Sequence, residues 1–527
     1  MAARQLSIEG HSDIADFYNG RSVFITGATG FMGKVLVERL LSACPGVDKL
    51  YLLLRSKKDT APQKRLLQLK ESQVFDNIRR TNPSQLSKLE VVEGDITKPA
   101  LGLPPATVAR LKDVSVVFHT AATVKFDEEL NLSVVMNVLA PLRVIEVANQ
   151  LPAVEALVHV STAYCNCDRR LVEEKLYPPP ADLDKLLALC DALPTDLLAD
   201  ITQKYIGDRP NTYTFTKAMG EHAVVKNSGK YPVAIFRPTI VTAALSRPFP
   251  GWVDTFTGPT GLLVGAGKGV VRTLHCRKEL VTDLLPVDIA IDTLIAVGWQ
   301  TAIERCLDVK VYNCGTSDLN PITWRQYEEY IREFLRHHPF DNCLWYPGGA
   351  MQNNKYVDRV YQIIFQTIPA YLVDYSAWLL GFHNTLSLVK LNKRMSAALS
   401  AIGFFTVHEW HFKTDNTQKL CARLSSGDSK LFNLDPNSID WRQYMYHYVK
   451  GTRKYALKEK DQDIEKAKTR MRKFWYLHYG LQAITLILFL RYILKNSETT
   501  RNIVFGTTKM LLSLFTNSYA PFVKSGQ

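Results

Sequence analysis

Short apolar runs alternate with helical patterns along the first 320 residues of the chain. The runs are apolar at successive positions, which is typical of strands that are covered on both faces. Helical periodicity separates them, as in Lys34–Leu41. This alternation predicts an α/β fold with a Rossmann-like, doubly wound parallel sheet. The expected strands are Ser22–Thr26, Lys49–Leu54, Leu89–Glu93, Val114–His119, Ala156–Ser161, Val233–Arg237 and Val309–Asn313.

The pattern divides the chain into segments. Residues 1–345 are assigned to the α/β domain, with long insertions at residues 168–210 and 246–282 that we expect on the ligand side of the sheet. Residues 346–450 are rich in aromatic side chains and helical patterns, which predicts a helical C-terminal domain. Residues 451–473 form a basic linker.

A C-terminal membrane anchor follows the linker. Phe474–Leu490 contains no Asp, Glu, Lys or Arg, and aromatic residues beginning with Trp475 cluster at one end. We therefore predict a transmembrane helix over residues 474–494; a helix buried against the body is the alternative. The tail, residues 495–527, includes a second apolar stretch at 503–515, which is either an interfacial helix or half of a hairpin.

The charge distribution is uneven. The chain carries a net charge of +13, and residues 450–527 hold 15 Lys and Arg against 5 Asp and Glu. The remainder is close to neutral, which argues against nucleic-acid binding. More cations precede the apolar run than follow it, so the body should face the cytosol. The nine cysteines lack zinc-binding spacing, so we expect reduced thiols and no metal site.

A glycine-rich turn links the first strand to a helix. Its sequence is Thr-Gly-Ala-Thr-Gly-Phe-Met-Gly over residues 26–33. Gly27 permits the tight turn, Gly30 lets the backbone approach a pyrophosphate, and Gly33 lets the helix pack against the sheet. With Thr29, Phe31 and Met32, these glycines are the predicted dinucleotide-binding turn.

The ends of the next strands suggest the rest of the cofactor site. Arg55 stands where NAD-dependent proteins place an acidic residue, and its guanidinium can pair with a 2′-phosphate, which favours NADPH. A solvent-exposed strand-end arginine is the alternative. Asp95, followed by Ile96, can accept a hydrogen bond from adenine, and the small Ala121 and Ala122 leave room for the middle of the cofactor.

A second constellation suggests acid–base chemistry. Tyr213 and Lys217 fit the spacing YxxxK, which places both on one face of a helix, and the ammonium is expected to lower the phenol pKa. Tyr446 and Lys450 repeat this spacing, and we interpret that match as chance. Ser161 and Thr162 end the fifth strand, where a hydroxyl can hold a carbonyl oxygen; Thr162 is weakly preferred.

These residues resemble the extended short-chain dehydrogenase/reductase group and, within it, animal fatty acyl-CoA reductases. The shared stretches are FYNGRSVFITGATGFMGKVL, LYLLLRSK, FHTAATVKFDE, HVSTAYCNCDR, IGDRPNTYTFTKAMGEH, FRPTIV, PFPGWVD, DLLPVDIAID and VYNCGT. The resemblance extends over nearly the whole chain. Met32, where the family usually has Leu, and Met219-Gly220 are its mild departures.

The resemblance implies reduction of a long-chain acyl-CoA to a fatty alcohol through an aldehyde, with two NADPH. It gives Lys217 a second role on the nicotinamide ribose, assigns a proton relay to Asn137, and adds Pro238 and Ile240 to the cofactor site. It implies an apolar acyl channel shaped by the second domain and the insertions, and anchoring in a peroxisomal or endoplasmic-reticulum membrane. Chain-length preference, organelle and oligomeric state stay undetermined.

Two other functions fit the same residues. One is an extended-family reductase or epimerase that acts on a sterol or a sugar nucleotide. The other is a catalytically inactive membrane tether that keeps the nucleotide fold, against which the intact Tyr213–Lys217 pair counts.

Overall fold

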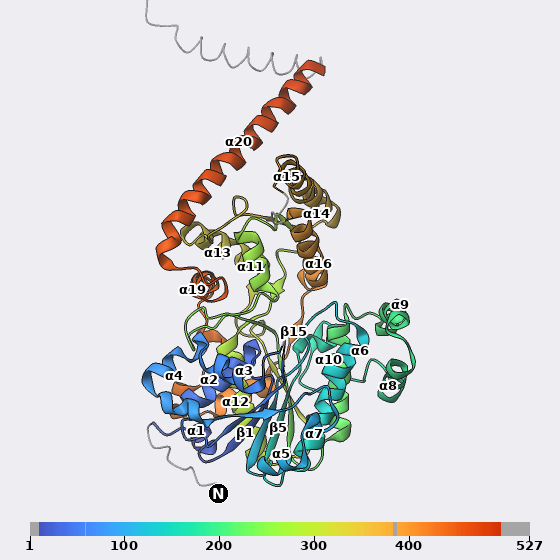
Figure 1. Ribbon diagram of the computed structural model, residues 1–527, viewed down its shortest axis with the longest axis vertical. Helices are drawn as coiled ribbons and strands as arrows, with labels where there is room; N and C mark the ends of the chain where they lie inside the picture. Colours follow the sequence, from blue (N-terminus) through green and yellow to red (C-terminus); the bar gives the residue numbers. More distant parts are fainter. Residues whose placement is uncertain (1–9, 58, 383–386, 497–527) are drawn as a thin grey trace, which may run out of the picture.

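The structure is a computed structural model that describes residues 10–57, 59–382 and 387–496 (Figure 1). Its centre is a seven-stranded sheet in the order β12-β7-β5-β4-β1-β2-β3, in which all neighbouring strands are parallel. All seven predicted strands are present and their ends differ by at most one residue. The strands are β1 (Ser22–Thr26), β2 (Leu50–Leu54), β3 (Leu89–Glu93), β4 (Val114–His119), β5 (Ala156–Val160), β7 (Val233–Pro238) and β12 (Lys310–Cys314).

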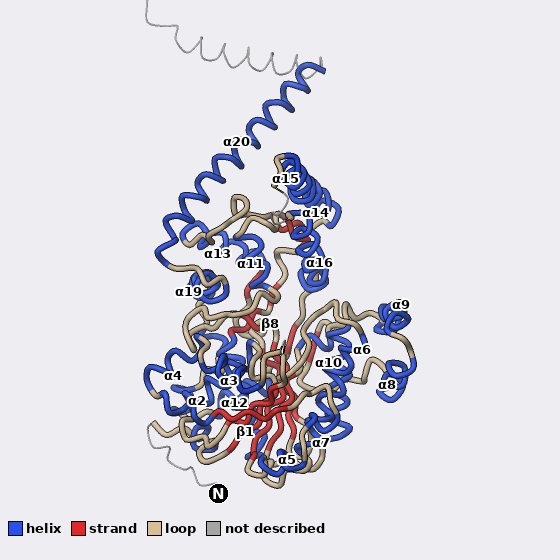
Figure 2. The backbone as a smooth tube through the Cα atoms, viewed as in Figure 1, coloured by secondary structure: helices blue, strands red, loops and turns tan. Residues whose placement is uncertain are grey.

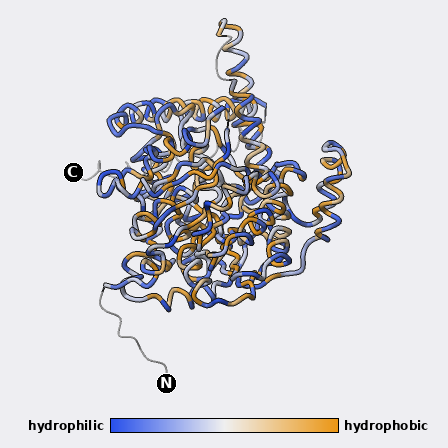
Figure 3. Tube along the Cα trace, turned by 60° about the horizontal axis from the view of Figure 1, so that its bottom comes forward, coloured by the Kyte–Doolittle hydropathy of each residue, from blue (hydrophilic) through white to orange (hydrophobic). Residues whose placement is uncertain are grey.

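Helices cover both faces of the sheet, as the unbroken apolar strands require. On one face, α12 (Val287–Glu304) packs against α2 (Phe31–Ala43), and α1 (Asp13–Phe17) lies beside them. On the other face, α10 (Thr212–Asn227) packs against α7 (Ala140–Ala148). Figure 2 shows the strands between these two layers, and Figure 3 shows hydrophobic segments concentrated in the middle of the body.

Shorter elements complete the α/β body and its insertions. They are α3 (Pro62–Lys70), α4 (Asp76–Thr81), α5 (Pro105–Arg110), α6 (Leu130–Val134), β6 (Leu171–Val172), α8 (Leu183–Ala192), α9 (Thr195–Ile206), β8 (Ile240–Thr242), β10 (Val281–Thr282), β11 (Leu284–Pro286) and β13 (Ile322–Thr323). A π-helical turn, η4 (Val135–Leu139), joins α6 to α7.

The strand order creates a crevice at the carboxyl edge of the sheet. From β1 the chain runs outward through β2 and β3, whereas from β4 it runs the other way through β5, β7 and β12. The loops that follow β1 and β4 therefore diverge and leave a gap between them, and ligands of doubly wound sheets bind there. The glycine turn follows β1, and the Ser161–Thr162 pair follows β5 at the same edge.

The second half of the chain extends beyond the sheet (Figure 1). One group of elements projects from the body: α11 (Pro259–Gly267), β9 (Thr273–His275), α13 (Trp324–His337), β14 (Ala350–Gln352), α14 (Lys355–Gln362), η6 (Ile363–Thr367), α15 (Ile368–Leu379) and α16 (Leu388–Thr406). A second group returns toward the body: β15 (His411–Phe412), α17 (Asp415–Arg423), α18 (Ser426–Leu431) and α19 (Trp441–Gly451).

Buried polar contacts join the returning helices to the N-terminal part. Asp428 accepts hydrogen bonds from the Ser12 hydroxyl at 2.6 Å and from the Ile14 amide at 3.0 Å. Arg39 in α2, which pairs with Asp292 in α12, also donates to the Leu431 carbonyl of α18 at 2.5 Å. Helices α17–α19 thus share a core with the sheet, while α14–α16 extend from it; the domain boundaries drawn from the sequence stay a prediction.

The last described helix, α20 (Ile464–Asn496), combines much of the basic linker with the described part of the predicted anchor. It points away from the body (Figure 1), and its apolar side chains from Leu486 to Leu490 are exposed. Within the described residues, one helix is long and apolar enough to cross a membrane: Leu130–Ala148, which is mostly buried in the core. The second apolar stretch, residues 503–515, lies outside the described residues.

Candidate active site

The glycine turn forms a cradle that side chains would fill. Gly27 has φ +80°, and a Cβ on it would lie 2.7 Å from the amide nitrogen of Ala121. A Cβ on Gly33 would lie 2.2 Å from the carbonyl oxygen of Gly27. Gly30 is the N-cap of α2, so the free amides of that helix face the space in front of the turn. These residues fit the pyrophosphate of a dinucleotide.

The insertion at residues 246–282 contacts this turn through Trp252. Its indole stacks on the ring of Phe31 with centroids 5.5 Å apart and planes at 12°. Nearby, Lys34 pairs with Asp254 at 2.5 Å. The insertion thus covers the start of α2. The sequence marked this insertion as ligand-side but did not single out Trp252 or Asp254.

Two guanidinium groups lie at the end of β2. Arg55 pairs with Asp95 at 3.3 Å, and half of its side chain is exposed. Arg65 in α3 donates to the Thr29 hydroxyl at 2.9 Å and to the Arg55 carbonyl at 2.7 Å. Partial burial and the neighbouring Arg55 lower the pKa of Arg65. Arg65 was not identified from the sequence because it lies in the first turn of α3, well beyond the end of β2.

Other predicted cofactor residues lie along the same edge. The Ala121 amide donates to the Thr26 hydroxyl at 3.3 Å, and Ala122 follows it, half-buried. Ile96 is buried beside Asp95, whose carboxylate also accepts from the Thr97 amide at 2.9 Å. The last two predicted cofactor residues lie on the far side of the crevice, where Pro238 ends β7 and Ile240 begins β8.

Tyr213 and Thr162 meet at the carboxyl end of β5. Tyr213 begins α10, whose N-cap Asn211 accepts a hydrogen bond from the Thr214 amide at 2.9 Å. Burial raises the pKa of Tyr213, and a hydrogen bond with the Thr162 hydroxyl lowers it by less. The net direction is opposite to the one expected from the sequence, since Lys217 does not contribute to it. The phenol is therefore protonated at neutral pH.

Lys217 lies one turn further along α10 and is almost fully buried. Its ammonium donates to the Val160 carbonyl at 2.8 Å. Burial lowers the pKa of Lys217 to about 8, and the negative charge of Glu221 partly opposes this. The helix spacing does place Tyr213 and Lys217 at one strand end, but the ammonium is held by the backbone of β5.

A buried ion pair fixes α10 to β7. Arg237 contacts Glu221 through two bonds of 2.8 and 2.6 Å, and both side chains are inaccessible to solvent. Burial alone would raise the pKa of Glu221, but the charge of Arg237, helped by the Ser161 hydroxyl, lowers it. The Ser161 hydroxyl thus lies beside the ion pair, without a hydrogen-bond partner among the described residues, whereas the Thr162 hydroxyl lies beside the phenol. This division was not evident from the sequence.

Asn137 connects the loop after β4 to α10. Its side-chain oxygen accepts from the Thr123 amide at 3.1 Å, and its nitrogen donates to the Thr216 hydroxyl at 3.0 Å. It lies in the π-turn η4, and π-turns are frequent at functional sites. A Cβ on Gly220 would lie 2.2 Å from the Asn137 carbonyl, so the close approach of this turn to α10 requires glycine.

Aromatic rings enclose the phenol on its outer side. Phe126 lies 5.7 Å from Tyr213, and Phe405 at the end of α16 lies 5.4 Å from Phe126. Phe405 also meets Tyr164 edge-to-face at 5.4 Å. The projecting helices therefore contribute an apolar wall to the site. The sequence did not indicate this contact, because residues 126 and 405 are far apart in the chain.

Comparison with known proteins identifies the chain's relatives. Two family models described as male sterility protein match it, a NAD-binding model over residues 25–294 and a "Sterile" model over residues 365–459. Fatty acyl-CoA reductase 1 of Xenopus laevis is 36% identical over 498 residues, which cover 94% of this chain and 96% of that protein. The chain belongs to the fatty acyl-CoA reductase family. Homo sapiens fatty acyl-CoA reductase 1 is 36% identical over 491 residues, covering 93% and 95% of the two chains.

Solved structures support the fold of this reductase. The terminal R domain of the myxalamid biosynthetic pathway has a TM-score of 0.52 at 19% identity and covers 82% of this chain and 90% of that one. The reductase domain of a nonribosomal peptide synthetase from Mycobacterium tuberculosis also has a TM-score of 0.52, at 18% identity, with coverage of 82% and 91%. The resemblance seen in the sequence is confirmed, and the protein is an oxidoreductase that uses a nicotinamide nucleotide.

Proposed function

We propose that this reductase converts a long-chain fatty acyl-CoA to a fatty alcohol through an aldehyde, with NADPH as reductant. The observation that carries the proposal is the grouping of Tyr213, Thr162 and Lys217 beside the glycine cradle in a chain of the fatty acyl-CoA reductase family. The preference for NADPH rests on the guanidinium groups of Arg55 and Arg65, which suit a 2′-phosphate.

The chain's own residues account for proton transfer. A bound nicotinamide nucleotide supplies hydride to the carbonyl carbon. Tyr213 and Thr162 hold the carbonyl oxygen, and Tyr213 gives it a proton as negative charge develops. The thiohemiacetal then releases CoA as the thiol and leaves the aldehyde. In a second round, with a second nicotinamide nucleotide as the hydride source, the aldehyde oxygen would lie on the same hydroxyls, and Tyr213, reprotonated from solvent, would protonate the alkoxide.

The raised pKa of Tyr213 suits this direction of reaction. A reduction needs a proton donor, and a phenol that stays protonated at neutral pH is one. Lys217 is suited to a neighbouring role, because it lies one turn after Tyr213 on α10 and its ammonium is bonded to the Val160 carbonyl at the end of β5. Asn137 holds the loop after β4 in place against α10, which supports the relay assigned to it.

The central test is Tyr213→Phe, because it removes the proton donor and keeps the ring. We expect loss of fatty alcohol formation from palmitoyl-CoA and NADPH, with nucleotide affinity largely retained, measured by product chromatography and by nucleotide titration. Tyr446→Phe is the matched control, since it alters the second YxxxK match and should leave turnover intact. Unchanged alcohol formation in Tyr213→Phe would refute the assigned role.

The same assay separates the other two functions. An enzyme for sterols or sugar nucleotides would turn over such a substrate and leave palmitoyl-CoA unchanged. A tether would bind NADPH but reduce neither palmitoyl-CoA nor hexadecanal. Membership of the fatty acyl-CoA reductase family favours the acyl-CoA substrate over both.

We also propose that residues 474–494 anchor the protein in a peroxisomal or endoplasmic-reticulum membrane with the body in the cytosol. The exposed apolar side chains of α20 support this, as do the cations that precede them, among them Lys466, Lys468 and Arg472. The N-terminal part, residues 1–345, would then hold the nucleotide, and residues 346–450 would border the acyl chain.

A further inference from the structure

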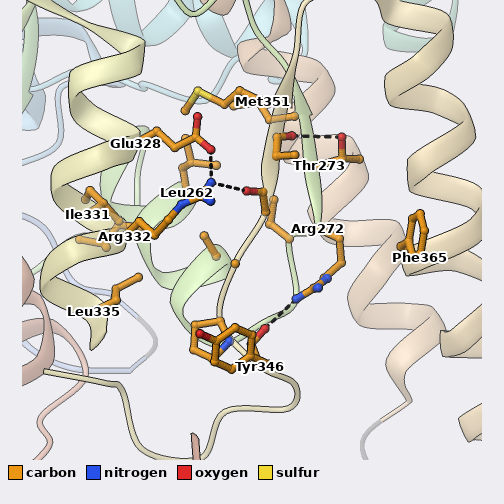
Figure 4. Close-up of a pocket in the computed structure, with 18 of the residues that line it drawn as sticks. Leu262, Arg272, Thr273, Glu328, Ile331, Arg332, Leu335, Tyr346, Met351 and Phe365 are labelled. Atoms are coloured by element: carbon orange, nitrogen blue, oxygen red, sulfur yellow. Dashed lines mark hydrogen bonds and ion pairs between the residues drawn. The ribbon is translucent and has the colours of Figure 1, made fainter. Parts of the chain in front are cut away.

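A cavity of about 300 Å³ lies apart from the catalytic site, between α11, α13, the β9–β14 pair and α20 (Figure 4). This volume is at the lower end of the range for small-molecule sites, about 300–1,000 Å³. None of the residues assigned above to the nucleotide or to catalysis lines it. Its wall is mainly apolar, with Leu262, Ile331, Leu335, Met351 and Phe365 turned toward the space.

Three guanidinium groups border this apolar space. Arg272 donates to the Tyr346 carbonyl at 2.7 Å, and Arg332 donates to the Gly349 carbonyl at 3.1 Å and pairs with Glu328. Arg336, on the same helix as Arg332, also lines the cavity. Within the described part of the chain, neither Arg272 nor Arg336 takes part in an ion pair.

The position of Arg272 is the informative one. Its side chain is partly buried, and burial lowers its pKa. A cation removed from water is costly unless an anion or several hydrogen bonds compensate it. Among the described residues, the Arg272 guanidinium bonds to one backbone carbonyl and pairs with no carboxylate. An anion at the edge of the cavity would complete this arrangement.

The cavity also borders the proposed membrane side of the molecule. Met471 and Tyr479 of α20 line it, and so do Tyr361 of α14 and Phe365 of η6. The neighbouring surface of α14, η6 and α15 is unusually apolar for one that faces solvent. Its exposed large side chains include Tyr356, Ile364, Phe365, Tyr371, Leu372 and Trp378.

We propose that this cavity binds one fatty acyl chain that carries an anionic head group. The chain lies among the apolar residues of α11, α13 and β14, and the head group lies against Arg272 and Arg336. The occupant is a membrane lipid with a single acyl chain, such as a free fatty acid or a lysophosphatidate, and this assignment does not rest on the proposed function. The tail of the acyl-CoA substrate is the alternative that the test separates, because it carries no anionic group when its thioester lies at Tyr213.

Photolabelling of the full chain tests the site. The protein in phosphatidylcholine vesicles is irradiated with a diazirine analogue of palmitate, and labelled peptides are mapped by mass spectrometry. We expect adducts in residues 259–274, 324–336 and 350–365. Arg272→Gln and the exposed Arg336→Gln should each lower the labelling by about tenfold, as for the loss of one charge-assisted hydrogen bond. Arg80→Gln, a charge change on α4, is the matched control.

Competition identifies the source. If lysophosphatidate displaces the probe and palmitoyl-CoA does not, the cavity holds a membrane lipid. If palmitoyl-CoA displaces the probe and Arg336→Gln raises the KM for palmitoyl-CoA, the cavity holds the substrate and the proposal is overturned. Adducts confined to peptides around Tyr213 or to α20, or cavity adducts unchanged in both arginine variants, would overturn the proposal. Alcohol formation is assayed in the same vesicles, so labelling without reduction would refute the proposed function and leave the cavity assignment standing.

Discussion

At the scale of single residues, the environment of a side chain decides its chemistry. The spacing of Tyr213 and Lys217 indicated an acid–base pair with a lowered phenol pKa. In the structure, burial instead raises the pKa of Tyr213 and lowers that of Lys217. The glycines behave differently, since a Cβ on Gly27 or Gly33 meets backbone atoms whatever the side-chain arrangement. A sequence motif therefore predicts backbone geometry more directly than it predicts the pKa of a side chain.

Lys217 should produce a pH limit on activity. Its pKa of about 8 means that the ammonium loses its proton as the pH rises through that value. We expect kcat/KM for hexadecanal to fall above about pH 8, and the fall to move to higher pH in Lys217→Arg, because a guanidinium stays charged. Steady-state rates between pH 6 and about 10 measure this.

The titration of Lys217 would not lower activity above about pH 8 by unfolding the protein. Because the pKa of Lys217 in the folded protein lies below its ordinary 10.5, the unfolded chain binds more protons between about pH 8 and 10.5. This residue therefore makes the folded state relatively more stable as the pH rises in that window. A profile that is the same in Lys217→Arg would show that the ammonium is not the titrating group.

Nucleotide preference is the second test at this scale. Arg55→Ala should relax the preference for NADPH over NADH, and Arg65→Ala should do so as well, because each removes a positive charge from the end of β2. The ratio of kcat/KM for the two nucleotides measures the effect. Lys88→Ala, a surface cation bonded to the Pro45 carbonyl, is the control; equal ratios in wild type and both variants would refute the assignment.

At the scale of elements, hydrogen bonds and ion pairs position the catalytic helix. Helix α10 is held to β7 by Glu221 and Arg237, to the β4 loop by Asn137, and to β5 by Lys217. The predicted strands appear with their expected ends, because continuous apolar runs specify buried strands locally. These cross-links do not follow from local pattern, because each joins elements that are distant in the chain.

The buried ion pair should dominate stability in this region. Glu221→Gln leaves the Arg237 charge unpaired in the interior, which should lower the free energy of unfolding by about 3–5 kcal/mol. Glu90→Gln, which breaks partly exposed pairs with Lys49 and Arg110, should lower the free energy of unfolding by much less. Urea denaturation compares the two variants, and equal losses would show that the buried pair does not hold α10.

At the scale of the whole molecule, the structure separates a nucleotide-binding end from an apolar end. The sheet body lies at one end of the molecule and α15 and α20 lie at the other, with the carboxyl edge of the sheet facing the projecting helices (Figure 1). Helices α18 and α19 bond to the sheet body, so the chain crosses between the two ends more than once. Helix α16 connects them and places Phe405 near the phenol.

Membrane binding should depend on α20. Replacing Leu486 and Leu488 by Asp puts two charges in the exposed apolar stretch, at a cost of about 2.5–3.5 kcal/mol each in a bilayer centre. We expect loss of flotation with vesicles on a density gradient. Leu67→Asp in α3, an equally exposed apolar position on the body, should float normally. Full flotation of the α20 variant would exclude this helix as the anchor.

The sequence by itself determined the sheet, the glycine turn and the residue pair at 213 and 217, because buried strands, tight turns and helix spacing are local properties of the chain. The tertiary structure decided which hydroxyl meets the phenol, why the phenol keeps its proton, and which distant side chains complete the site. Arg65, Trp252 and Phe405 reach the crevice only through folding, and the pKa values of Tyr213 and Lys217 depend on burial that no local pattern encodes.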